Sequence, residues 1–136
     1  MRDYPSTLNG SGVAKMFLPM LQAKLHRVTV THSDLNYEGS CGIDSVLLGR
    51  SGIRPNQKIE IYNVSTGARF STYVIRAANE SGTISLNGAA ARLAAVGDLL
   101  IICAYVLCTP AELETHRPVI VFVDERNRPR DSRHGE

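Results

Sequence analysis

Residues 58–75 alternate between apolar and polar side chains on both sides of a short turn. Ile59 and Ile61 are flanked by polar neighbours, and Ser65-Thr66-Gly67 supplies turn residues before the chain returns. Alternation with a period of two is typical of a strand with one buried face. Two such runs joined by a turn that contains glycine favour a hairpin. The sequence therefore predicts a β-hairpin here.

The same period recurs elsewhere in the chain. We expect four further strands, over residues 23–31, 83–86, 99–107 and 119–123. Capping residues and helix propensity predict short helices at 44–48 and 89–94 and a helix start at 109–112. The apolar run at 99–107 is shorter than the roughly 20 residues that a membrane helix needs, so we interpret it as a buried strand. The predicted fold class is mainly β with a few short helices.

Composition indicates one compact domain. The chain has 136 residues, 43% of them hydrophobic and 21% charged, with a net charge of +2. This excess is too small to argue for a nucleic-acid or membrane partner, and it falls largely in the segment Arg126 to Arg133. We expect residues 124–136 to form a polar, disordered tail.

The cysteines and the first residues of the chain indicate the cellular compartment in which the protein is expected. Cys41, Cys103 and Cys108 are odd in number and lack the paired spacing of metal ligands. This pattern favours a reducing compartment over a disulfide framework and argues against zinc. Residues 1–19 lack a charged segment followed by a long apolar stretch, so no signal peptide is predicted. We expect a cytoplasmic protein.

The Gly39-Ser40 bond is a candidate for self-cleavage. The Ser40 hydroxyl can attack the Gly39 carbonyl and move the acyl group from nitrogen to oxygen, and glycine lets the nucleophile approach. β-Elimination of that ester would leave dehydroalanine at residue 40. Its hydrolysis by water, with release of ammonia, would give a pyruvoyl group. Cys41 is a rival nucleophile, but its thiol would cut one bond later, so we interpret it as a small buried side chain.

Three further segments carry candidate functional groups. On an extended segment Lys24, His26, Val28 and Val30 share one face. Gly88-Ala89-Ala90 precedes or begins a short helix, where free N–H groups can bind a carboxylate. On the second strand of the hairpin the residues on one face include Arg69 and Tyr73, while Thr72 lies on the other face.

Four motifs in order resemble the aspartate 1-decarboxylases. They are Lys24-Leu25-His26-Arg27, Asp34-Leu35-Asn36-Tyr37-Glu38-Gly39-Ser40, Arg69-Phe70-Ser71-Thr72-Tyr73 and Asn87-Gly88-Ala89-Ala90-Ala91. The resemblance covers about Met20 to Val123 and implies a double-psi β-barrel and a homotetramer with active sites between subunits. It also implies cleavage between Gly39 and Ser40 and decarboxylation of L-aspartate to β-alanine, a step of pantothenate and coenzyme A biosynthesis.

The resemblance also implies roles for single residues. Ser40 becomes the pyruvoyl group, which binds the substrate amine and accepts its electrons, with no metal and no pyridoxal phosphate. Tyr73 is the proton donor, and Thr72 assists self-cleavage at the Gly39 carbonyl. Since an ideal strand sends Thr72 and Tyr73 to opposite faces, the segment must bend or the two must serve different sides of the site.

Substrate binding is implied for a second set of residues. The planar fork of Arg69 can pair with both oxygens of a carboxylate, which a lysine cannot. The other implied substrate contacts are Thr72, Gly88, Ala89, Ala90 and Lys24. Two positions stay open: His26 is either a structural histidine or a minor member of the pocket, and Asn87 either acts in the site or makes the turn.

The ends of the chain depart from the family. Because the family normally starts near Met20, residues 1–19 are interpreted as an N-terminal extension, with Met16 or Met20 as alternative starts. Residues 20–123 are expected to form the decarboxylase domain. The alternative function is a non-catalytic β-barrel binding module in which Gly39-Ser40 is a plain turn.

Overall fold

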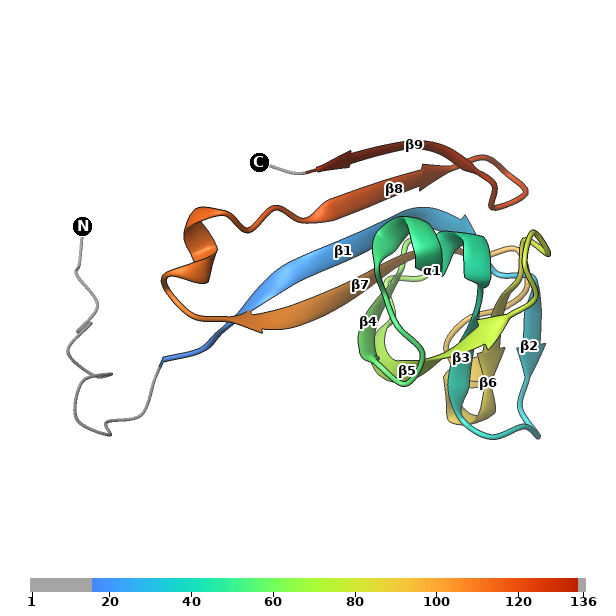
Figure 1. Ribbon diagram of the computed structural model, residues 1–136. Coiled ribbons are helices and arrows are strands. Elements are labelled where there is room, and N and C mark those ends of the chain that lie inside the picture. The colour runs from blue at the N-terminus through green and yellow to red at the C-terminus, as the bar shows by residue number, and fades with distance from the viewer. Residues whose placement is uncertain (1–15, 135–136) are drawn as a thin grey trace.

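The computed structural model describes residues 16–134, and these form a β-rich fold (Figure 1). Nine strands lie in the hydrogen-bonded order β2-β6-β3-β5-β4-β7-β1-β8-β9. The strands are β1 Leu18–Thr29, β2 His32–Asp34, β3 Ser40–Asp44, β4 Lys58–Asn63, β5 Arg69–Ala77, β6 Ile84–Asn87, β7 Leu99–Cys108, β8 Val119–Val123 and β9 Pro129–His134. The mainly β prediction is confirmed, while the double-psi form of the barrel stays a prediction. Within residues 16–134 no helix has the length and apolarity to cross a membrane.

The predicted hairpin is present as β4 and β5. Their antiparallel register runs without a shift from Lys58 opposite Tyr73 to Tyr62 opposite Arg69. Ile59 and Ile61 are fully buried, whereas Arg69 and Tyr73 are exposed, so the period of two separates an inner from an outer face. This hairpin therefore fixes which side chains of β5 point away from the core.

Strand β1 departs from the predicted alternation. It pairs antiparallel with β7, and the register shifts between Leu25 and Val28. Arg27, inside this bulge, has a positive φ of 62°. Because a bulge inserts an unpaired residue, Leu25 and Val28 are both fully buried, although alternation placed them on opposite faces.

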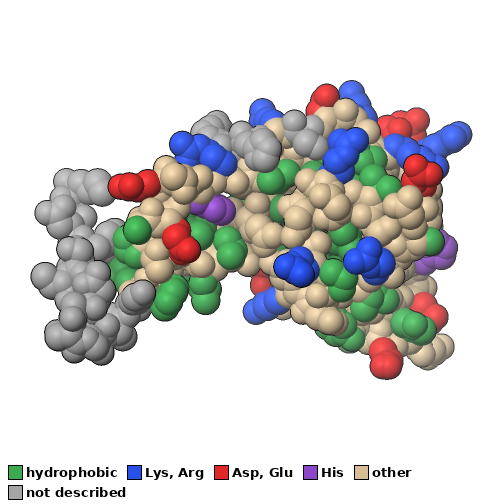
Figure 2. All heavy atoms as spheres, viewed as in Figure 1, with side chains coloured by type: hydrophobic (Ala, Val, Ile, Leu, Met, Phe, Trp, Pro, Cys, Tyr) green, Lys and Arg blue, Asp and Glu red, His purple; other side chains and the backbone are tan. Residues whose placement is uncertain are grey.

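The outer half of β7 was wrongly expected to be buried. Leu100 and Ile102 have no exposed surface, but Val106 and Leu107 are 37% and 62% exposed. Figure 1 shows why: the ends of β1 and β7 project away from the other strands as a two-stranded arm. Hydrophobic side chains gather along this arm in Figure 2. Phe17, beside the start of β1, is 54% exposed.

The helices are short. Helix α1 (Ser45–Ser51) begins where the Asp44 side chain accepts a hydrogen bond from the Val46 N–H, and it ends at Gly52. The other two are 3-10 helices, η2 (Gly88–Arg92) and η3 (Glu112–Glu114). Before η3, Thr109 and Glu112 exchange backbone and side-chain hydrogen bonds, which is the predicted capping arrangement.

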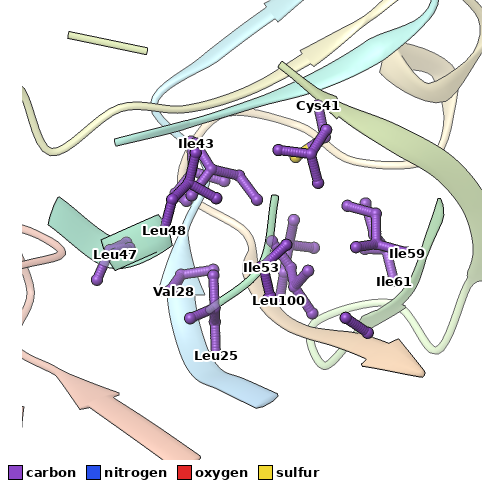
Figure 3. Packing of buried hydrophobic residues seen from close by; sticks show 14 of the residues in the cluster. Leu25, Val28, Cys41, Ile43, Leu47, Leu48, Ile53, Ile59, Ile61 and Leu100 are labelled. Atoms are coloured by element: carbon purple, nitrogen blue, oxygen red, sulfur yellow. The ribbon is translucent and has the colours of Figure 1, made fainter. Parts of the chain in front are cut away.

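One core lies between α1 and the curved strands (Figure 3). It collects fully buried aliphatic side chains from distant parts of the sequence. They include Leu25, Val28, Ile43, Leu47, Ile59, Ile61 and Leu100. Burial of such side chains stabilises the fold by about 1.5–3 kcal/mol each.

The C-terminal segment is ordered in the structure, contrary to the expected disordered tail. Strand β8 pairs parallel with β1, and β9 pairs antiparallel with β8. The turn before β9 is held by Asn127, which is 1% exposed and donates from Nδ2 to the carbonyls of Thr29 and Gly82. Strand β1 begins at Leu18, inside the segment expected as an extension, and residues 1–15 lie outside the described residues.

Candidate active site

Ser40 opens strand β3 and is buried, with 1% of its surface exposed. Its direct partner across the antiparallel ladder with β6 is Asn87. The Asn87 Nδ2 donates to Ser40 Oγ at 3.0 Å, and the Ser40 hydroxyl donates to the carbonyl of Glu38 at 3.3 Å. The hydroxyl is thereby held beside the bond that precedes its own residue.

Gly88 packs directly against the Gly39 backbone. A Cβ placed on Gly88 would lie 2.7 Å from Gly39 Cα, 2.8 Å from Gly39 N and 2.9 Å from the Tyr37 carbonyl oxygen. Gly88 also has a positive φ of 67°. Any side chain at this position would have to displace the backbone at the Gly39-Ser40 bond.

Tyr73 lies on the same side of the sheet as Ser40. Cys41 pairs with Val74 of β5 and with Leu86 of β6, and all three are fully buried. Since neighbouring residues of a strand point to opposite faces, Ser40 and Tyr73 both point away from the core. The register therefore places Tyr73, which is 40% exposed, on the strand beside Ser40 and on the same face of the sheet.

A surface cavity of about 620 Å³ adjoins this cluster. Its lining includes Tyr37, Ile75, Ser85 and Asn87. Asn87 thus contacts Ser40 on one side and this cavity on the other. Asn87 ends β6, and its side chain donates a hydrogen bond to Ser40.

Thr72 points to the opposite face from Tyr73. The β4–β5 ladder runs through both residues without a bulge, so the segment does not bend. The two side chains therefore lie on opposite faces of β5. In the register of β3 and β5, Thr72 lies one residue before Tyr73, as Gly39 lies one residue before Ser40. Nevertheless, no hydrogen bond joins Thr72 to Gly39 among residues 16–134.

Arg69 is the first residue of β5, four residues before Tyr73. Its guanidinium carbon is 4.1 Å from the centroid of the Tyr62 ring, directly across the hairpin. The Tyr62 hydroxyl is 3.1 Å from that of Tyr105 on β7. At about 3.3 Å per residue, Arg69 and Tyr73 are about 13 Å apart along the strand.

Lys24 and His26 lie together on β1, as predicted, but far from Ser40. Three strand pairings separate Lys24 on β1 from β5. They join Lys24 to Cys103 on β7, Cys103 to Glu60 on β4, and Glu60 to Ser71 on β5. Three spacings of about 4.8 Å put Lys24 about 14 Å from β5.

His26 does not fit the interpretation of a satisfied structural histidine. Its Nδ1 is buried and makes no hydrogen bond, and its ring meets Phe122 edge-on at 5.5 Å. Burial lowers the pKa of His26, and the positive charges of Lys24, Arg27 and Arg133 lower it further.

Cys41 is fully buried, as predicted, and burial raises the pKa of its thiol to about 12. A thiol held protonated is a weak nucleophile, which fits a small buried side chain at Cys41. All three cysteines are free. Among residues 16–134 no three His, Cys, Asp or Glu side chains gather as metal ligands.

Comparison with known proteins places the chain. A family model described as aspartate decarboxylase matches residues 16–130. The chain belongs to the aspartate decarboxylase family. The aspartate 1-decarboxylase of Methylococcus capsulatus is 66% identical over 108 residues, which cover 79% of this chain and 86% of that protein. That of Bordetella avium is 60% identical over 114 residues, covering 84% and 93% respectively. The predicted family is confirmed.

The fold divides the predicted decarboxylase site residues into two groups. The first, around the Gly39-Ser40 bond, contains Ser40, Tyr73, Asn87 and Gly88. The second, on the outer face of β1, β7, β4 and β5, contains Lys24 and Arg69.

Sequence reasoning missed Tyr62 and Tyr105, which adjoin Arg69. Counting back from the Ser65-Thr66-Gly67 turn would have paired Tyr62 with Arg69. The hydroxyl contact with Tyr105 depends on the position of β7, which no local pattern gives.

Proposed function

We propose that this member of the aspartate decarboxylase family converts L-aspartate to β-alanine and CO2 after cutting itself between Gly39 and Ser40. The observation that carries the proposal is the buried Ser40 hydroxyl, held by Asn87 and the Glu38 carbonyl beside a glycine pair packed in contact. Relatives of 58–66% identity carry the name aspartate 1-decarboxylase.

The cleavage step uses groups that adjoin the Gly39-Ser40 bond. The Ser40 oxygen bonds to the Gly39 carbonyl carbon, and the Gly39–Ser40 C–N bond breaks, leaving an ester and the free amine of residue 40. The close packing of Gly88 supports the idea that the Gly39 backbone is held in one conformation for this attack. Thr72, as the assisting donor, would need a shift of the turn to reach the Gly39 carbonyl.

The surroundings of Ser40 fit a pyruvoyl group. A small planar group at this position would lie beside the Asn87 amide, a donor already aimed at Ser40 Oγ, in a site closed by backbone at Gly39 and Gly88. Such a group supplies a carbonyl that withdraws electrons from a bound amine. Tyr73, on the same face, is placed to hold a proton for the carbon that loses CO2.

A complete substrate site needs more than one copy of the chain. In the same chain, strand geometry puts Arg69 about 13 Å from Tyr73 along β5 and Lys24 about 14 Å from β5, across the outer face. We therefore infer a homo-oligomer, a tetramer in the family pattern, in which the carboxylate-binding Arg69 and Lys24 of one copy meet the Ser40 cluster of another. The exposed apolar arm of β1 and β7 supports burial against a partner copy.

The backbone of Gly88, Ala89 and Ala90 is the third element proposed to contact substrate. It follows Asn87 directly and starts the 3-10 helix η2, so its N–H groups lie beside the Ser40 cluster. The three free cysteines support a reducing compartment, and we propose the cytoplasm.

The test combines mass spectrometry with an assay of β-alanine formation. The wild-type chain should lose its 14.8 kDa species to two fragments, the second blocked by a pyruvoyl at residue 40, and should release CO2 from aspartate. Ser40→Ala should stay intact and inactive. Thr72→Val should cleave more slowly than Thr72→Ser, which keeps the hydroxyl. A wild-type chain that stays whole and inactive would favour the binding-module alternative.

A further inference from the structure

Arg69 carries an exposed guanidinium with no carboxylate partner among residues 16–134. The ion pair within 4 Å in that range joins Lys58 to Glu60, at 3.8 Å. Glu60 lies two residues from Tyr62 on the same face of β4, but it is paired with Lys58. The fork of Arg69 is therefore left for a carboxylate from outside the chain.

The orientation of that fork is set by Tyr62. The guanidinium lies over the ring at 4.1 Å from its centroid, within the range of a cation–π contact. Stacking occupies one face of the planar group and leaves its N–H edge free, which is the edge that a carboxylate binds. A cross-strand pair of this kind limits the rotamers of a long side chain that is otherwise in solvent.

Tyr105 in turn holds Tyr62. Tyr62 pairs with Ile101 on β7, so Tyr105 is four residues further along that strand, and the two hydroxyls still meet at 3.1 Å. The rings thus lean toward each other. Cys103, which lies between Ile101 and Tyr105 on the outer face, is only 4% exposed. Its burial indicates that side chains cover this part of an outer face.

The hydroxyl contact with Tyr62 also affects the pKa of Tyr105. The hydrogen bond from Tyr62 raises the pKa of Tyr105, and burial raises it further. A substrate carboxylate therefore meets a cation and hydroxyl groups there.

We propose that Tyr62 and Tyr105 are positioning residues that hold the Arg69 guanidinium for a substrate carboxylate. The proposal rests on the function proposed above and deepens it: in the carboxylate subsite Arg69 of β5 stacks on Tyr62 of β4, and Tyr105 of β7 holds Tyr62 through its hydroxyl group. All three belong to one chain, so the subsite is complete in every copy, whichever copy supplies Ser40.

The first experiment separates binding from turnover in the wild-type oligomer. Tyr62→Leu removes the ring, and the KM for L-aspartate should rise roughly three- to tenfold, the size of a partly exposed cation–π contact. The kcat should stay within about twofold, because Tyr62 does not touch the reacting bond. Tyr62→Trp, which restores an aromatic face, should recover the wild-type KM. Val64→Ala, at an exposed position just after the end of β4, is the matched control and should change neither constant.

The second experiment needs no turnover. Succinate, a dicarboxylate without an amine, is titrated calorimetrically into the uncleaved Ser40→Ala chain with and without Tyr62→Leu. The dissociation constant should rise by the same factor as the KM. Tyr105→Phe keeps the Tyr62 ring and should weaken succinate binding roughly two- to fivefold, the worth of one hydrogen bond. This variant carries the test if Tyr62→Leu does not fold.

The outcomes are distinct. Succinate that binds the Ser40→Ala chain equally well with and without Tyr62→Leu, or does not bind at all, would overturn the positioning role. A Tyr62→Leu enzyme with lower kcat and unchanged KM would overturn it too, since that pattern indicates a structural effect. If Tyr62→Leu weakens succinate binding but the wild-type chain neither cleaves itself nor releases CO2 from aspartate, the proposed carboxylate subsite would stand and the proposed decarboxylase function would be refuted.

Discussion

Replacement of Gly88 by alanine tests the packing beside the cleavage bond. The new Cβ would lie 2.7 Å from Gly39 Cα and 2.8 Å from Gly39 N, and these are backbone atoms that cannot rotate away. Alanine at a φ of 67° costs about 1–2 kcal/mol, and forcing an extra carbon into a packed site costs about 1–3 kcal/mol. We expect a total loss of about 2–5 kcal/mol, a large part of the 5–15 kcal/mol typical of a domain.

Gly67→Ala is the matched control. Gly67 also has a positive φ, 85°, but nothing lies within 4 Å of an added Cβ. It should therefore lose only the backbone part, about 1–2 kcal/mol. The difference between the two variants, about 1–3 kcal/mol, isolates the contact with Gly39.

The assay is urea unfolding of both variants and the wild type at one protein concentration, since oligomers unfold in a concentration-dependent way. Mass spectrometry of the same samples gives the cleaved fraction. The Gly88 variant should accumulate uncleaved chain because its added Cβ displaces the Gly39 carbonyl from the Ser40 hydroxyl. Equal stability of the two variants, together with normal cleavage of the Gly88 variant, would refute the reasoning.

Three further predictions follow from the same region. Asn87→Ala, which removes the donor to Ser40 Oγ at 3.0 Å, should slow self-cleavage and cost about 1 kcal/mol of stability, as measured by the cleaved fraction over time and by urea unfolding; an unchanged rate would exclude Asn87 from cleavage. Tyr73→Phe should cleave normally but lower kcat by roughly 10²-fold or more in the β-alanine assay, and full activity would remove Tyr73 as proton donor. Burial raises the pKa of the Cys41 thiol to about 12, so on raising the pH the unfolded chain loses the thiol proton before the folded chain does. The contribution of the thiol to the free energy of unfolding is therefore full below about pH 9 and falls between about pH 9 and 12. Urea unfolding at several pH values should show a shallower alkaline loss for Cys41→Ala than for the wild type, and parallel curves would contradict the assignment.

The local sequence pattern was sufficient to predict elements whose interacting residues are neighbours in the sequence. The hairpin was predictable because Ile59 and Ile61 alternate on either side of polar residues and Gly67 ends the turn. The Asp44 cap was predictable for the same reason, since its partner Val46 is two residues away.

Pattern failed where the partner was distant. The bulge at Arg27 allows both Leu25 and Val28 into the core, and periodicity alone does not locate a bulge. The tail from residue 124 reads as polar and unstructured, yet β9 pairs with β8 because backbone hydrogen bonds need no apolar side chains. The exposed half of β7 was misread because burial depends on what covers a strand.

The sequence by itself determined the family and led to the proposal of Ser40 as the nucleophile, because these depend on which side chains exist and in what order. Only the tertiary structure decided their arrangement. It put Asn87 against Ser40, packed Gly88 on Gly39 and stacked Arg69 on Tyr62, but left Lys24 and Arg69 far from the Gly39-Ser40 bond. These distances follow from strand order, which is set by long-range backbone pairing and burial of one shared core rather than by any local run of residues.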